Sequence, residues 1–144
     1  MQTDMPGKYR FLDHPADLMI EGTGRTMEES WSHVILAAAT QIIGEHGTPV
    51  QKTITVQAAR LQSLLFDLLS DIIARVDVKK FVPTGVLSMQ IQKPQTANGM
   101  YSVTCVLAGR IVETIENPIK AVTYHQMNIQ LGAKSVSTTV VFDI

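Results

Sequence analysis

The sequence predicts a single α+β domain over residues 1–144, with a largely antiparallel or mixed β-sheet, or two packed sheets, and two amphipathic helices on one side. Apolar residues recur with helical spacing in two segments, from Thr26 to Gly44 and over 61–78. Several segments around them alternate apolar and polar residues with the period of a strand. The pair Asn98-Gly99 separates two such segments and favours a turn with positive φ, as in an antiparallel hairpin.

The first expected helix has a clear start signal. Thr26 with Glu29 three residues later forms a capping box, and Glu28 and Glu29 suit the positive end of the helix dipole. Gly44 and Gly47 are expected to end this helix. We expect Trp31, on its apolar stripe, to be a core residue.

The strands are expected at 8–12, 18–23, 50–58, 86–92, 101–108, 119–124, 127–131 and 136–144, and those at 119–124 and 127–131 are one kinked strand or two. On the second helix, Asp67 and Asp71 are interpreted as surface carboxylates and not as a metal pair. Cys105, within a strand, is expected to be a buried inert thiol.

The composition excludes several classes of protein. The formal net charge is −1, so no excess of Lys and Arg is present to neutralise phosphates, which argues against strong direct nucleic-acid binding. A single cysteine excludes an internal disulfide and a thiolate zinc site, and favours a cytoplasmic protein. We expect no signal peptide and no membrane span.

Ionisable side chains gather near the amino terminus, where Asp13, His14 and Asp17 occupy five positions around Pro15. Pro15 keeps His14 out of helical geometry, so the cluster belongs to a turn or a strand edge. Carboxylates brought together there repel each other unless a proton or a cation lies between them. His14, between two carboxylates, is a stronger functional candidate than the lone His125.

A second group of carboxylates lies at the other end of the sequence. If the chain ends at Ile144, its α-carboxylate lies beside Asp143, and together they make half of a site for calcium, magnesium or manganese. Asp17 or Asp13 could complete the site. From spacing alone, a frayed and solvated terminus is the simpler interpretation, because nothing in the sequence brings the two ends together.

Three motifs, in this order, resemble those of the archease family: FLDHPADLMIEGTGRTMEES at 11–30, KAVTYHQMNI at 120–129 and VVFDI at 140–144. The leucine-rich helix between them is also similar to that of the family. Pro15 stands where the family has threonine, and Met19 and Gln126 stand where glycine is common. The resemblance covers nearly the whole chain.

The resemblance implies a non-enzymatic protein cofactor of the tRNA-splicing RNA ligase, an enzyme that uses GTP and manganese. The cofactor would promote guanylylation of the ligase and its multiple turnover. The resemblance also implies a metal site with ligands Asp17, Asp143 and Ile144, while Asp13, His14, Lys120 and His125 occupy further motif positions of second rank.

Two other functions remain open at this point. One is a chaperone-like interaction module for RNA-modifying enzymes. The other is a small metal-dependent hydrolase with His14 as its base. We expect a monomer that works on a protein partner, with the ligase ranked first because of the resemblance.

Overall fold

The computed structural model describes residues 2–14, 17–44 and 46–144 and confirms the α+β class. Every strand pair in it is antiparallel. The elements, in chain order, are β1 (Tyr9–Leu12), β2 (Asp17–Gly24), α1 (Met27–Ala39), β3 (Thr48–Ala58), α2 (Leu61–Lys79), β4 (Phe81–Gln92), β5 (Tyr101–Ile111), β6 (Ala121–Leu131) and β7 (Val136–Asp143).

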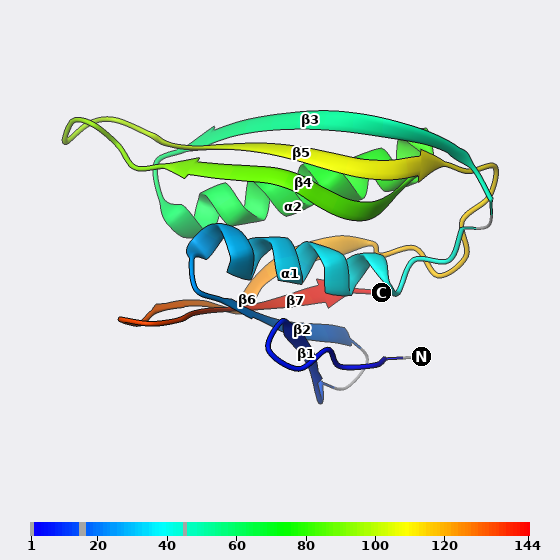
Figure 1. Cartoon of the computed structure of the whole chain (residues 1–144), viewed down its shortest axis with the longest axis horizontal. Coiled ribbons are helices and arrows are strands. Elements are labelled where there is room, and N and C mark those ends of the chain that lie inside the picture. The colour runs from blue at the N-terminus through cyan, green and yellow to red at the C-terminus, as the bar shows by residue number, and fades with distance from the viewer. Residues whose placement is uncertain (1, 15–16, 45) are drawn as a thin grey trace.

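The strands form two sheets, and the helices lie between them (Figure 1). One sheet has the order β1-β2-β7-β6 and the other has the order β3-β5-β4. α1 packs against β2 and β7 of the first sheet and against β4 of the second, while α2 packs against β6 and β3. Each sheet therefore has both helices on one side, as expected, and the helices separate the two sheets from each other. Each apolar stripe is wide enough to bury a helix against two sheets at once.

The start of α1 confirms the predicted cap, but the helix ends earlier than predicted. The hydroxyl of Thr26 accepts a hydrogen bond of 3.1 Å from the backbone N–H of Glu29. The Glu29 carboxylate accepts one of 2.9 Å from the backbone N–H of Arg25. The helix stops at Ala39, before the two glycines. Gly47 serves another purpose, because a Cβ there would lie 2.3 Å from the backbone oxygen of Ile111.

A buried polar link fastens α1 to the four-stranded sheet. The Ser30 hydroxyl lies 2.9 Å from the carbonyl oxygen of Gly22 in β2 and 2.8 Å from the hydroxyl of Thr138 in β7. Gly22 permits this close approach, since a Cβ there would lie 2.5 Å from the backbone oxygen of Ser30. The link holds β2 and β7 against one helix.

The hairpin of β4 and β5 is confirmed, but β4 begins at Phe81 and not at Val86. Pro83 and Gly85 lie inside β4, where register shifts interrupt the pairing. A proline is tolerated there because β4 is an edge strand. β6 is one strand with an irregularity between Thr123 and Asn128, which is the kink that the sequence predicted.

Individual side-chain predictions also hold. Trp31 and Cys105 are fully buried in one core to which both sheets contribute. On the surface of α2, Asp67 is exposed and Asp71 pairs with the Arg75 guanidinium at 2.6 Å. In the part of the chain that the structure describes, no helix is long and apolar enough to cross a membrane.

Candidate metal site where the chain ends meet

Asp17 and Asp143 are neighbours across β2 and β7. The two residues are register partners, as are Leu18 and Phe142, the next pair along the strands. Directly opposed residues of an antiparallel pair present their side chains on the same face, with Cβ atoms roughly 4.5–5.5 Å apart. The fold therefore brings Asp17 and Asp143 to opposed positions, as the family resemblance implied and spacing alone did not.

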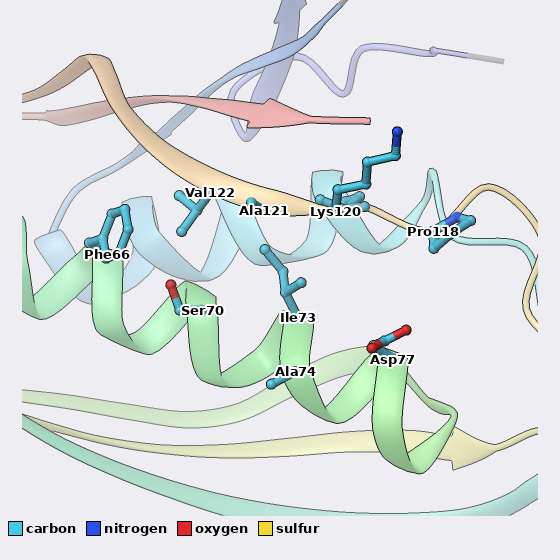
Figure 2. A pocket seen from close by; sticks show the side chains of 10 residues that line it. Phe66, Ser70, Ile73, Ala74, Asp77, Pro118, Lys120, Ala121 and Val122 are labelled. Carbon is cyan, nitrogen blue, oxygen red and sulfur yellow. The ribbon is translucent and has the colours of Figure 1, made fainter.

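We call the place where Asp17 and Asp143 are opposed the carboxylate corner. The third strand at this corner, β6, pairs with the other edge of β7 and holds Asp143 there. Ala121 is the register partner of Asp143 in β6. The backbone N–H of Lys120 donates a hydrogen bond of 2.8 Å to the Asp143 carbonyl oxygen. In Figure 2 the Lys120 side chain points away from α2. The end of β7 is thus held on both edges.

His14 lies against the Asp17 carboxylate. Its Nδ1 is 3.1 Å from Oδ2 of Asp17, and the two side chains are 18% and 28% exposed. The direction of approach does not form a hydrogen bond, so among the residues that the structure describes Nδ1 is buried without a hydrogen-bond partner. The ring of His125 meets that of His14 edge-on, with centroids 5.9 Å apart. His14 therefore borders the Asp17 carboxylate, and His125 packs behind it on the His14 ring.

The remaining residues that the sequence suggested for the metal site have fewer contacts with Asp17 and Asp143. Asp13 is exposed and takes part in no ion pair or side-chain hydrogen bond within the described ranges. Pro15, which replaces the threonine of the motif, lies outside the described residues. Ile144 follows Asp143 directly, and its side chain is half exposed.

A pocket of about 510 Å³ adjoins this corner. Leu18, Lys120 and Ile144 line it together with carboxamide side chains that sequence reasoning missed, those of Gln2, Gln41 and Asn117. No spacing signal marks these amides, because they come from three separate loops or termini.

The donor groups at this corner fit a hard cation. Two opposed carboxylates supply oxygen ligands, and like charges in such a pair are destabilising without a counterion. Among residues 2–14, 17–44 and 46–144, no three His, Cys, Asp or Glu side chains form a metal cluster. Asp17 and Asp143 would therefore need main-chain or water oxygens, including those of Ile144, to complete a coordination shell.

An apolar groove of about 450 Å³ starts at the same corner and runs between α2 and β6 (Figure 2). Ile73 of α2 and Val122 of β6 both point into the space between these elements in that view. Near it, the rings of Phe66 and Tyr124 stack with centroids 4.1 Å apart. Lys120 lines both the groove and the pocket, so the two concave surfaces meet there.

Comparisons with known proteins give a consistent family assignment. The model of the "Archease protein family (MTH1598/TM1083)" matches residues 9–144. A protein archease from Methanosarcina barkeri is 31% identical over 143 residues, which cover 95% of this chain and 96% of the relative. One from Pyrobaculum neutrophilum is 28% identical and covers 92% of each chain.

Two solved structures share the fold. Protein 1598 of Methanobacterium thermoautotrophicum, solved in solution, matches with a TM-score of 0.72 at 21% identity, covering 97% of this chain and 100% of the other. A crystal structure from Thermotoga maritima, described as "an archease, possible chaperone", matches with a TM-score of 0.56 at 21% identity, covering 92% and 94%. Neither the family description nor these names denote an enzyme.

Proposed function

Because the chain belongs to the archease family, we propose that it is a cytoplasmic protein cofactor of the GTP-dependent tRNA-splicing RNA ligase. In this proposal the protein promotes guanylylation of the ligase and allows it to turn over repeatedly. It does so through a divalent-metal site with ligands Asp17, Asp143 and the α-carboxylate of Ile144. Calcium, magnesium and manganese all suit such oxygen ligands.

The observation that supports the proposal is the register pairing of Asp17 with Asp143. Two carboxylates held face to face at the end of a sheet create a local negative potential that a cation relieves. The buried core pair Leu18 and Phe142 holds the register, so the backbones of Asp17 and Asp143 stay opposed. A bound cation would then have to fix only the side-chain rotamers of the two carboxylates.

The neighbouring residues have positioning roles in this proposal. His14 packs against the Asp17 carboxylate and restricts where it can point. The Lys120 backbone N–H holds the Asp143 carbonyl, which fixes the direction of the last strand residue. A divalent ion bound there would supply positive charge that could neutralise nucleotide phosphates in the ligase.

Mixing the purified ligase, GTP and manganese with and without this protein tests the proposal. We expect the protein to increase the rate of ligase guanylylation, and Asp143→Asn to remove that increase while leaving the protein folded. Asp67→Asn is the matched control, because it removes an exposed carboxylate on α2. An unchanged guanylylation rate with the wild-type protein would refute the proposal.

A chaperone-like interaction module is the second candidate, and the apolar groove beside β6 favours it. The Thermotoga maritima relative is described as a possible chaperone. This function predicts binding to several purified RNA-modifying enzymes, weakened by Phe66→Ala and unaffected by Asp143→Asn. Binding that is confined to the ligase and depends on Asp143 favours the first candidate instead.

The metal-dependent hydrolase ranks third. It would use Asp17 and Asp143 with His14 as the base. Turnover of a phosphoester by the protein alone, lost in Asp17→Ala, is the result that would support it.

A further inference from the structure

The charges of the molecule are divided unequally between its two sheets. The three strands β3, β4 and β5 contain no Asp or Glu, and their charged residues are Lys52 and Arg110. The whole chain nevertheless has a net charge of −1. The three strands therefore carry two positive charges and no negative one. Arg110 is the cation of the outer face, because Lys52 alternates onto the face of the buried Ile54.

The outer face of this sheet is open. Its inner face carries the buried residues Ile54, Val103 and Leu107, and both helices pack on that side. On the outer face, the two edge strands β3 and β4 present exposed, uncharged side chains with amide or hydroxyl groups. They are Gln51, Thr53, Thr55 and Gln57 of β3 and Ser88, Gln90 and Gln92 of β4.

One end of this face is hollowed into a pocket of about 540 Å³. Ala108 and Gly109 of β5 are small residues of its lining. The polar side chains that line it are Gln51 of β3, Thr84 of β4 and Arg110 of β5, so each strand of the sheet contributes one. No carboxylate side chain lines the pocket.

Arg110 has an unmet need for a hydrogen-bond acceptor. Its Nε is buried and has no hydrogen-bond partner. Arg110 takes part in no ion pair within the ranges that the structure describes. Nε is shielded from a ligand in the pocket as it is from water, so an anion would meet the guanidinium through its outer Nη atoms, which are not buried. A charge-assisted hydrogen bond to a guanidinium is among the stronger kinds in proteins.

We propose that this pocket binds a phosphate monoester, with Arg110 as its principal anchor. A guanidinium presents several N–H donors in a fixed fork that matches phosphate geometry. The Gln51 amide and the Thr84 hydroxyl add neutral donors. This excess of donors favours a phosphate, with its three terminal oxygens, over a carboxylate with two. The volume leaves room for a small organic group on the phosphate.

The site is separate from the carboxylate corner in sequence and in sheet. Asp17 and Asp143 lie in the four-stranded sheet, whereas Arg110, Gln51 and Thr84 lie in the three-stranded one. Binding at this pocket therefore does not depend on the proposed metal site or on the ligase, and it can be measured on the isolated protein.

The test is a titration of the full chain with phenyl phosphate, followed through the NMR signals of the Arg110 guanidinium group. We expect these signals to shift with saturation, and Arg110→Gln to weaken binding at least tenfold. Arg110→Lys should weaken it too, because an ammonium lacks the fork. The matched control Arg60→Gln, which removes an exposed cation at the start of α2, should leave binding unchanged.

Thermal unfolding provides a second measurement. Phenyl phosphate should raise the unfolding temperature of the wild-type protein and not that of Arg110→Gln. Equal responses of these two proteins, or equal weakening by Arg60→Gln, would overturn the proposal. Benzoate that binds as tightly as phenyl phosphate would overturn the assignment to phosphate, since a carboxylate would then satisfy the pocket equally well.

Discussion

Asp17 and Asp143 face each other across β2 and β7, although they come from opposite ends of the sequence. The pairing is maintained by the core and not by the carboxylates themselves. Leu18 and Phe142, one residue further along each strand, are almost fully buried. A register slip of one residue would turn these apolar side chains to the other face, so the sheet keeps the two acidic residues opposed.

The first prediction concerns the repulsion between the Asp17 and Asp143 side chains and its effect on the free energy of unfolding. In the presence of a chelator, Asp143→Asn should raise the free energy of unfolding by about 0.2–1 kcal/mol, because it removes a like-charge pair from opposed positions. Addition of calcium or manganese should stabilise the wild-type protein and not the variant. Urea unfolding, with Asp67→Asn as the control, measures both effects. If Asp143→Asn and Asp67→Asn behave alike, the paired carboxylates do not bind a cation.

The second prediction concerns the buried link between α1 and the four-stranded sheet. Ser30→Ala leaves the Gly22 carbonyl and the Thr138 hydroxyl without that partner, and should cost about 1–3 kcal/mol of unfolding free energy. Thr138→Val should cost less in the Ser30→Ala background than in the wild type. A double-mutant cycle by urea unfolding gives the coupling, which we expect to be about 0.5–3 kcal/mol. Additive effects would show that the two hydroxyls do not stabilise each other.

The local elements of the fold could be predicted from local signals. The Thr26 cap, the pairing of β4 with β5 and the irregularity in β6 each depend on a few neighbouring residues, and all three are confirmed. The positive φ expected at Asn98-Gly99 is wrong, because neither residue adopts it and the Gly99 N–H instead donates to the Thr96 carbonyl. The start of β4 was missed because Pro83 normally marks the end of an element. It is compatible with a strand only at a sheet edge, which is a property of the tertiary structure.

The site depends on tertiary information to a greater degree. The resemblance to the archease family singled out Asp17 and Asp143 as cation ligands and implied that the chain ends meet, whereas spacing alone left Asp13 open and did not join the ends. The strand pairing shows how the two residues come together. The position of the helices between two sheets could not be predicted, because one apolar stripe is compatible with one covering sheet or with two. Arg110 gave no signal at all, since an isolated arginine in a strand usually faces solvent. Its buried Nε becomes apparent only from the packing.

The third prediction concerns the close contact between β2 and α1. In Gly22→Ala the new Cβ would meet the backbone oxygen of Ser30 and the side chain of Val34, at 2.5 and 2.7 Å. Backbone cannot yield as a flexible side chain can, so we expect a loss of about 1–3 kcal/mol in unfolding free energy. Gly85→Ala is the control, because nothing lies within 4 Å of its added Cβ. It should change stability by less than about 0.5 kcal/mol.

The fourth prediction concerns the pH dependence of stability that arises from Cys105. Burial raises the pKa of this thiol from an ordinary value of 9.0 to about 11. The folded protein therefore keeps a proton that the unfolded chain releases above pH 9, and stability falls as the pH rises from 9 to 11. At pH 10 the loss should reach about 1.4 kcal/mol relative to pH 7. Lys and Tyr residues also titrate in this range, so the test is the difference between the wild type and Cys105→Ala in urea unfolding at each pH. Between pH 9 and 11 the free energy of unfolding of the wild type should fall relative to that of Cys105→Ala, and below pH 8 the difference should stay constant. A difference that is constant at every pH would mean that the thiol ionises as readily in the folded protein as in the unfolded chain.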